Sequence, residues 1–200
     1  MSTIRSICVY CGSSPGHDPV FADVARAFGK ILAERGITLV YGGGSRGLMG
    51  ALALSVHEHG GRVVGIIPDF LKLRERMFAG AQEIVVTRDM HERKRLMFER
   101  ADAFVALPGG IGTLEELVEQ LTWSQLGRHK KPILIANINA FWEPLIDLLE
   151  HMKRSGFIHS DLVIDYKVVD QVEQIVPAIE AAVARARAEA EPVSEAIERM

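Results

Sequence analysis

The residue types best suited to chemistry gather in one short segment, residues 108–116, with the sequence PGGIGTLEE. Its glycines expose backbone N–H groups because they carry no side chain, and a helix that begins here adds the positive end of its dipole. An anion, above all a phosphate, is the ligand that such a turn favours. We therefore expect the active site here, with the carboxylate of Glu116 close to a phosphate held by the backbone.

A purely structural role also fits these residues. The apolar spacing of Leu114, Leu117 and Leu121 predicts a helix from about Thr113, which places Glu116 at its third position. Thr113 and Glu116 then match a capping box, in which the two side chains satisfy each other's free backbone N–H groups. The segment alone leaves both roles open.

A second glycine-rich segment, GGGSRGLMG at residues 42–50, also follows an apolar strand candidate and opens a helix. Gly42, Gly44 and Gly47 match the G-x-G-x-x-G pattern of dinucleotide-binding folds, with Asp69 where a ribose-binding acid would fall. That pattern normally follows the first strand of the sheet, whereas here it follows the second. The candidate phosphate contacts from the first two strand ends are Gly12, Ser13, Gly43 and Gly44.

A third group of charged residues lies at residues 89–95, with the sequence DMHERKR. Asp89 is a natural N-cap, and Arg93 lies one turn further along, where it could pair with Asp89 on a solvated helix face. If this helix begins beside the PGG turn, however, Arg93 and Lys94 are brought towards the expected anion. The position of the helix in the sheet decides between these two roles.

A phosphate-binding backbone, a carboxylate at Glu116 and a guanidinium at Arg93 suit cleavage of the N-glycosidic bond of a nucleotide. The sugar becomes positively charged as the base leaves, and a carboxylate can stabilise that charge and accept a proton from water. Arg93 stays charged at neutral pH, so we expect it to stabilise charge and orient the substrate.

Strand and helix candidates alternate along the chain. The strand candidates are continuous apolar runs, as parallel strands covered on both faces require. Strands are expected at residues 4–10, 37–41, 62–67, 83–87, 102–107, 132–137 and 163–169, and helices at 19–35, 47–59, 90–100, 114–126 and 141–154. This alternation predicts an α/β fold with a doubly wound, mainly parallel, Rossmann-like sheet in a single domain. We assign residues 1–182 to a nucleotide-binding catalytic domain and 183–200 to a helix end and a polar tail prone to disorder.

In such a sheet, all loops that follow strands lie at one edge, where ligands bind near the switch in strand order. The loops at Gly12, Gly43, Pro68, Asp89 and Gly109 should therefore converge. The segment 69–82 shows no clear periodicity, and it is either a lid over the site or a plain surface loop.

The overall composition favours a small-molecule partner. The 200-residue chain has a formal net charge of -3, which gives no general attraction to nucleic acid or to an anionic membrane. The first residues lack the regions of a signal peptide and no apolar run is long enough to span a bilayer, so we expect a cytoplasmic protein.

Cys8 and Cys11 form a C-x-x-C pair without the helix start of a redox site or further zinc ligands, so we expect no metal and no cofactor.

Four motifs together resemble one family, the LOG (Lonely Guy) proteins, over about residues 4–180. The motifs are YGGGSRGLMG, MHERKRLM, PGGIGTLEE and LTWSQLG. The resemblance implies hydrolysis of N6-substituted adenosine 5'-monophosphates to free base and ribose 5-phosphate, with Arg93 and Glu116 as catalytic residues. Substrate contacts are expected from Glu75, Met90, Lys94, Gly109, Gly110, Ile111, Gly112, Thr113 and Thr122. Relatives have been labelled lysine decarboxylases, but nothing in this chain resembles a pyridoxal phosphate lysine site.

The sequence leaves two other functions open, and the resemblance also bears on the oligomeric state. A nucleotide-binding or carrier protein would use the same phosphate loops without turnover, and an NAD-dependent oxidoreductase would use Gly42, Gly44 and Gly47. The resemblance also implies a homodimer. Residues 48–54 are apolar on nearly every side, so this helix is expected to be deeply buried or shared with a second subunit.

Overall fold

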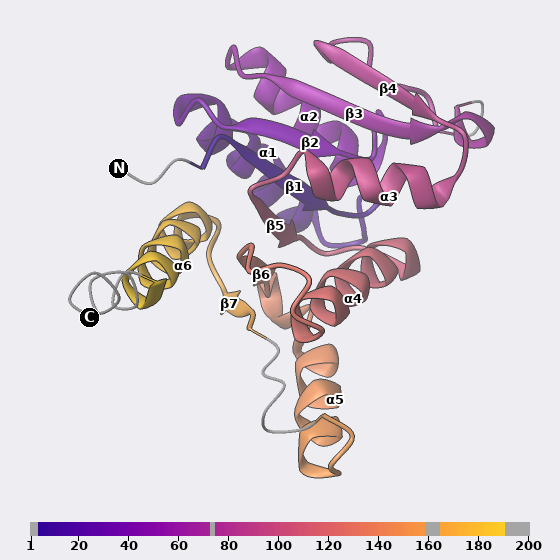
Figure 1. Cartoon of the computed structure of the whole chain (residues 1–200). Helices are drawn as coiled ribbons and strands as arrows, with labels where there is room; N and C mark the ends of the chain where they lie inside the picture. Colours follow the sequence, from indigo (N-terminus) through magenta and orange to yellow (C-terminus); the bar gives the residue numbers. More distant parts are fainter. Residues whose placement is uncertain (1–3, 73–74, 159–164, 191–200) are drawn as a thin grey trace.

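The computed structural model describes residues 4–72, 75–158 and 165–190, and these fold into an α/β domain built on one parallel sheet (Figure 1). The sheet has seven strands: β1 (Ser6–Tyr10), β2 (Thr38–Tyr41), β3 (Val63–Pro68), β4 (Glu83–Thr87), β5 (Ala103–Ala106), β6 (Ile133–Ala136) and β7 (Lys167–Val169). Every neighbouring pair is parallel. The fold class expected from the alternating pattern is confirmed.

The strand order is β4-β3-β2-β1-β5-β6-β7, so the chain winds outwards from β1 in one direction and from β5 in the other. β1 and β5 pair directly, with Tyr10 opposite Ala106 at their carboxyl ends. The loops after these two strands therefore flank the switch point, which is where open α/β sheets bind ligands.

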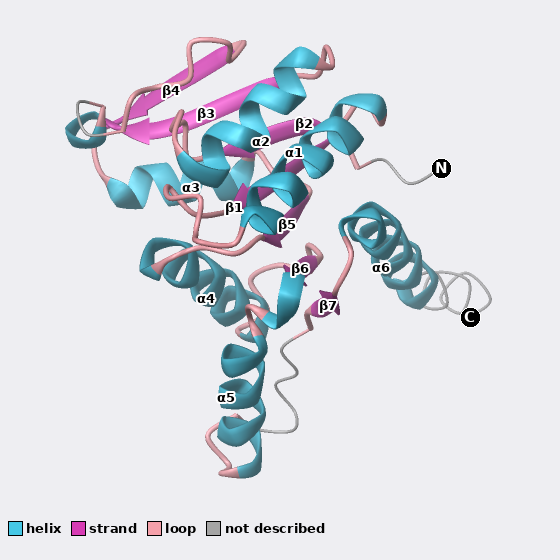
Figure 2. Cartoon of the chain, turned by 180° about the vertical axis from the view of Figure 1, so that it is seen from behind, coloured by secondary structure: helices cyan, strands magenta, loops and turns pink. Residues whose placement is uncertain are grey.

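Helices cover both faces of the sheet (Figure 2). One face carries α1 (Pro19–Glu34), α2 (Gly47–Glu58) and α6 (Ile175–Ala190), and the other carries α3 (Met90–Glu99), α4 (Ile111–Gln125) and α5 (Glu143–Arg154). Short 3-10 turns occur at Asp69–Leu71, Ile138–Ala140 and Val172–Gln174. This two-sided covering explains why the strands are apolar throughout rather than alternating.

Local sequence explains several helix ends. Asp18 caps α1 by accepting a hydrogen bond from the backbone N–H of Val20, and Pro19 occupies the first helical position. Gly36 adopts a φ of 65° just after α1, a left-handed conformation that glycine takes without steric cost. Asp89 caps α3 through the N–H of Glu92, and α2 ends at His59.

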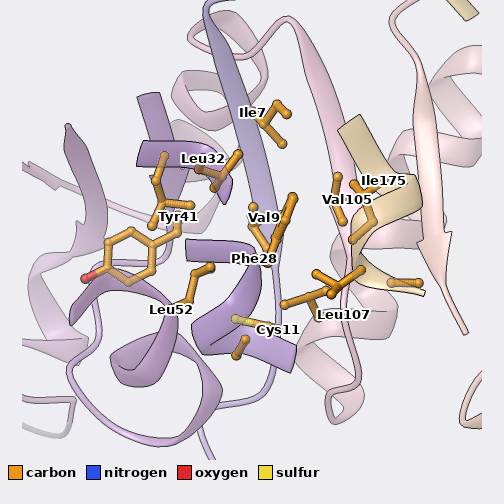
Figure 3. Close-up of a cluster of buried hydrophobic side chains, with 14 of the residues drawn as sticks. Ile7, Val9, Cys11, Phe28, Leu32, Tyr41, Leu52, Val105, Leu107 and Ile175 are labelled. Atoms are coloured by element: carbon orange, nitrogen blue, oxygen red, sulfur yellow. The ribbon is translucent and has the colours of Figure 1, made fainter. Parts of the chain in front are cut away.

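The core lies on both sides of β1 and β5. On the face of α1, α2 and α6 it includes Phe28, Leu52 and Ile175, which surround the central strands (Figure 3). Cys11 belongs to this cluster, whereas Cys8 belongs to the cluster on the opposite face. Both thiols are free and buried, and burial raises the pKa of each. The two cysteines therefore act as small core residues.

Some expected boundaries differ from the structure or fall outside it. α6 runs from Ile175 to Ala190, across the boundary drawn at residue 182, and residues 191–200 lie outside the described part. The last strand begins at Lys167, and residues 159–164 are likewise not described. The division into a domain of residues 1–182 and a tail thus stays a prediction.

The described helices include none with the length and apolar character needed to cross a membrane. Within the same residues, no three His, Cys, Asp or Glu side chains are grouped closely enough to hold a metal ion.

Helix α2 packs against α1, and the two helices come very close together at Gly29. A Cβ built on Gly29 would lie 2.6 Å from the carbonyl oxygen of Leu52 and 2.8 Å from Cβ of Ser55. Both distances are too short for real contacts, so any side chain here would force the two helices apart.

We predict that Gly29→Ala lowers the free energy of unfolding by about 1–3 kcal/mol, because it overpacks this helix contact. Urea denaturation followed by circular dichroism measures the loss. Lys30→Ala, at the exposed neighbouring position, is the control and should change stability by less than about 0.5 kcal/mol. Equal stability of Gly29→Ala and the wild type would contradict the close helix contact.

Candidate active site

The glycine turn at residues 108–112 leads directly into α4, as expected, but the helix starts earlier than predicted. Gly110 is the N-cap, no side chain caps the helix, and Ile111 is the first helical residue. The capping box between Thr113 and Glu116 is therefore wrong, and Glu116 is the sixth helical residue rather than the third. Gly110 can take the extended cap conformation at no steric cost, which lets the helix begin two residues before Thr113.

The start of α4 is open to a ligand. A Cβ built on Gly110 or Gly112 would meet no atom within 4 Å, and Ile111 is largely exposed. The first N–H groups of an α-helix have no partner inside the helix, and side-chain capping is absent here. Uncapped N–H groups, the positive helix end and free space are the features that the predicted anion site requires.

The loop after β1 lies against this turn. The N–H of Gly12 donates to the carbonyl of Pro108 (3.1 Å), and its carbonyl accepts from the N–H groups of Leu48 (3.0 Å) and Met49 (3.2 Å). A cavity of about 240 Å³ opens between the two loops. It is lined by Gly12, Ser13, Ser14, Pro15, Gly16, Phe21, Leu48, Pro108, Gly109, Gly110 and Phe141. The strand order thus brings Gly12, Ser13, Gly109 and Gly110 together at the switch point.

Arg93 and Glu116 meet in a buried ion pair beside this turn. Nη1 of Arg93 donates to Oε1 of Glu116 at 2.7 Å, and each side chain is only 10% exposed. Nε of Arg93 donates to the carbonyl of Ile66 at the end of β3 (3.1 Å), which fixes the guanidinium plane. Arg93 therefore pairs with Glu116 of α4, and the alternative of a surface pair with Asp89 is wrong.

Gly42 makes room for this pair at the end of β2. A Cβ on Gly42 would lie 2.5 Å from Nη2 of Arg93 and 3.1 Å from the sulfur of Met49. The guanidinium thus occupies the space that a side chain at Gly42 would fill. The first glycine of the G-x-G-x-x-G match serves the ion pair by providing this space.

The burial of Glu116 shapes its protonation. Burial raises the pKa of Glu116 above its usual value, Arg93 opposes this rise, and the neighbouring Glu115 adds to it. The net direction of the pKa is upward. A raised pKa brings a carboxyl group closer to the range in which it exchanges protons near neutral pH.

Lys94 lies beside the pair but makes contacts of its own. Its Nζ lies 2.6 Å from Oε1 of Glu115 and 2.6 Å from Oε2 of Glu119, and the lysine side chain is 13% exposed. Burial alone would lower the pKa of Lys94, but the two carboxylates outweigh it and the pKa is raised. Lys94 is therefore a charged link between α3 and α4.

The segment that follows the 3-10 turn Asp69–Leu71 packs against the second glycine loop. Gly44 forms a β-bridge with Met77, the carbonyl of Gly43 accepts from Phe78 (3.1 Å), and Ser45 donates to Arg76 (2.8 Å). Glu75 lies in the same segment, and its Oε2 is 3.4 Å from a Cβ built on Gly44. The described part of segment 69–82 thus packs on the site loops, which places Glu75 close to Gly44.

The remaining predicted contacts differ in position. Met90 is the first residue of α3, directly after the Asp89 cap. Thr113 is buried at the start of α4 beside Gly109. Thr122 lies further along α4 on its exposed side, where its hydroxyl donates to the carbonyl of Val118 (2.8 Å). The structure therefore brings Gly12, Ser13, Gly109 and Gly110 together at the cavity, whereas the contacts described for Met90 and Thr122 do not place them there.

Sequence reasoning missed several contributors. Glu119 was not singled out, although it follows Glu115 by one helical turn, which is the spacing that lets both reach one lysine. Phe21 and Phe141, whose rings meet edge to face with centroids 5.6 Å apart, form an apolar wall of the cavity. No local sequence pattern predicts such a wall, since the two residues come from distant segments of the chain.

We predict that Arg93→Ala lowers the free energy of unfolding by about 3–5 kcal/mol near neutral pH, because Glu116 is left buried without its counter-ion. The folded-state pKa of Glu116 then rises further above its unfolded value. This penalty is absent below the unfolded pKa, grows as the pH rises through it, and is complete above the folded pKa.

Urea unfolding at about pH 4 and about pH 7 should therefore show the smaller loss at the lower pH. Arg95→Ala, which removes an exposed partner of Glu99 at 4.0 Å, is the matched control on the same helix. A loss for Arg93→Ala that is equal at both pH values would contradict the ion pair.

Comparisons with known proteins agree with the motifs at this site. A family model described as "Possible lysine decarboxylase" matches residues 49–179. The cytokinin riboside 5'-monophosphate phosphoribohydrolase LOG of Oryza sativa subsp. japonica is 49% identical over 160 residues, which are 80% of this chain and 66% of that protein. A protein of Rhodococcoides fascians with the same enzyme name is 46% identical over 157 residues, which are 78% of this chain and 79% of that protein. The chain thus spans just under two thirds of the rice protein.

Solved structures with this fold include more distant proteins. The molybdenum cofactor binding protein from Rippkaea orientalis superposes with a TM-score of 0.67 at 19% identity, over 91% of this chain and 99% of that one. At that identity the similarity concerns the fold alone. The family model and the relatives, which cover the glycine turn and both members of the buried ion pair, establish that this chain belongs to the family of the LOG proteins.

Proposed function

We propose that this chain hydrolyses the N-glycosidic bond of adenosine 5'-monophosphates, including N6-substituted ones, to free base and ribose 5-phosphate. The observation that carries the proposal is the buried Arg93–Glu116 pair next to the uncapped start of α4. The enzyme names of the rice and Rhodococcoides relatives support the same reaction.

The geometry suggests a role for the start of α4 and for Glu116. The 5'-phosphate binds the free N–H groups at the start of α4, which places the sugar over the second turn of that helix. As the bond between the anomeric carbon and the base nitrogen breaks, its electron pair leaves with the base and the sugar becomes positively charged. Glu116 stabilises that charge and takes a proton from the attacking water, whose oxygen bonds to the anomeric carbon.

Arg93 keeps Glu116 available for this task. Burial raises the pKa of the carboxyl group, and the guanidinium at 2.7 Å limits the rise, so that the carboxylate can still act as a base. The bond from Arg93 to the carbonyl of Ile66 fixes the orientation of both groups. The departing base takes the proton that it needs from solvent.

Two alternatives are less well supported. A carrier protein would need the phosphate-binding turn but not a buried carboxylate with a raised pKa beside it. An NAD-dependent oxidoreductase would need the second glycine loop free for a pyrophosphate, yet Gly43 and Gly44 are engaged by Phe78 and Met77. Binding of NADH without binding of AMP would favour the oxidoreductase.

We predict that Glu116→Gln lowers the kcat for base release from AMP and from N6-isopentenyl-AMP by about 10²–10⁴-fold. Glutamine can still accept the hydrogen bond from Arg93 but can neither take a proton nor neutralise the guanidinium, so the melting temperature should fall. The rates are therefore compared at a temperature at which circular dichroism shows both proteins to be folded. Chromatography of the released base measures the rate. Glu99→Gln, on the exposed side of α3, is the control, and unaltered hydrolysis by Glu116→Gln would remove Glu116 from the chemistry.

We also propose a homodimer that uses the outer face of α4. Ile111 is 82% exposed, Val118 41% and Leu126 72%, and their spacing along the helix places them on one stripe. Thr122 lies on the same stripe, about 9 Å along the helix axis from Glu116. Its expected contact with substrate would therefore be made across the dimer interface. The helix first considered for this role, α2, is covered mainly by α1 and leaves Leu54 half exposed.

We predict that the double variant Val118→Glu with Leu126→Glu is a monomer, because it places charges in the centre of the apolar stripe. Size-exclusion chromatography with light scattering gives the mass. Phe157→Glu, which changes an equally exposed apolar residue outside α4, should leave the dimer intact. A monomeric wild type would refute the dimer.

The cytoplasmic location expected from the sequence stays a prediction.

A further inference from the structure

Lys94 and Arg93, which are adjacent on α3, together hold three acidic side chains of α4. Glu115 and Glu119 are one turn apart and both contact Nζ of Lys94 at 2.6 Å, while Glu116 contacts Arg93 at 2.7 Å. Two adjacent cations of α3 thus bind three carboxylates of α4. Because the contacts lie on both sides of Glu116 in sequence, they restrain the rotation and the sliding of α4 against α3.

The two carboxylates that hold Lys94 are not equivalent. Glu115 is 51% exposed, whereas Glu119 is 20% exposed, and Oε1 of Glu119 is buried without a hydrogen-bond partner in the described structure. A buried carboxylate with one unpartnered oxygen depends on its remaining ion pair. Glu119 therefore contributes the stronger and less screened contact to Lys94.

Lys94 also contributes to the electrostatic surroundings of Glu116. The groups that face Glu116 are Arg93 and Lys94 from α3, Glu115 from its own helix, and Cys8, Tyr10 and Cys11 from β1 and the loop after it. Burial raises the pKa of Tyr10 and of both thiols, so these three stay neutral. Lys94 thus supports Arg93 in opposing the rise of the pKa of Glu116.

We propose that Glu119 is a positioning residue, which holds Lys94 across the contact between α3 and α4 and thereby fixes Glu116 for catalysis. Lys94 then acts on Glu116 and not on the substrate, in contrast to the substrate contact expected from the family resemblance. The inference rests on the proposed hydrolase reaction for its kinetic consequences, but its effect on Glu116 does not depend on turnover.

The position of Lys94 supports this role. Its ammonium group already has two carboxylate partners and is largely buried, so a phosphate would have to compete with both. The uncapped N–H groups at the start of α4 offer the phosphate a site without such competition. A lysine that is neutralised by two glutamates adds little net positive charge to the pocket.

The test compares Lys94→Met, Lys94→Arg, Glu119→Gln and the double variant Lys94→Met with Glu119→Gln in the full chain. Lys94→Met and Glu119→Gln should each lower kcat for AMP by about ten- to hundredfold. The KM should stay within about twofold of the wild type, because the catalytic geometry is lost and substrate binding is not. The double variant should be no slower than the slower single variant, since both changes break the same contact. Lys94→Arg should restore most of the rate, and Glu99→Gln, whose exposed carboxylate pairs with Arg95 outside this contact, should stay within about threefold of the wild type.

A second readout is independent of turnover. The titration of Glu116, followed by NMR of ¹³C-labelled glutamate and assigned with Glu116→Gln, should move to higher pH in Lys94→Met and return in Lys94→Arg. A higher KM with unchanged kcat in Lys94→Met, or unchanged kcat in Glu119→Gln with only a lower melting temperature, would overturn the proposal. If the wild type releases no base from AMP, the proposed function fails, and the titration still decides whether Lys94 acts on Glu116.

Discussion

The candidate active site depends on one buried ion pair between two helices that the chain places on the same face of the sheet. Arg93 of α3 and Glu116 of α4 contact each other at 2.7 Å with side chains that are only 10% exposed. Neither charge could stay buried alone, because an isolated charge in a protein interior costs several kcal/mol. The pair therefore fixes how α3, α4 and the ends of β2 and β3 meet. Gly42, which leaves space for the guanidinium, and Ile66, whose carbonyl accepts its Nε–H, are consequences of the same constraint.

The parallel sheet brings the phosphate-binding turn to this pair. β1 and β5 lie side by side, so the loops at Gly12 and Gly109 meet at the switch point, and α4 leaves that point with free N–H groups. Glu116 follows on the second turn of the same helix, which links the position of a bound phosphate to the position of the carboxylate. A ligand held at the helix start would therefore have its sugar close to the one buried acid of this pair. Positioning and burial are the features of this site that the proposed reaction uses.

Sequence patterns predict most of the fold because parallel strands are local apolar runs and helix ends carry local signals such as Asp18, Gly36 and Asp89. The start of α4 was misplaced because Thr113 and Glu116 imitate a capping box, whereas Gly110 supplies the cap. The partner of Arg93 was also open, since Asp89 lies one turn away and Glu116 lies 23 residues away in the chain. Tertiary packing alone decides that contact. The arrangement of Lys94 with Glu119 was missed for the same reason, as it joins two helices that only the fold brings together.

The central claim is that a ribose 5-phosphate unit binds with its phosphate on the start of α4 and its anomeric carbon next to Glu116. A crystal structure of the chain with ribose 5-phosphate tests this most directly. The account predicts that the phosphate accepts hydrogen bonds from the first N–H groups of α4, and that the Glu116 carboxylate lies within about 3.2 Å of the anomeric hydroxyl. An empty switch-point cavity in a crystal that holds the ligand elsewhere, or a sugar bound with its anomeric carbon far from Glu116, would contradict the account.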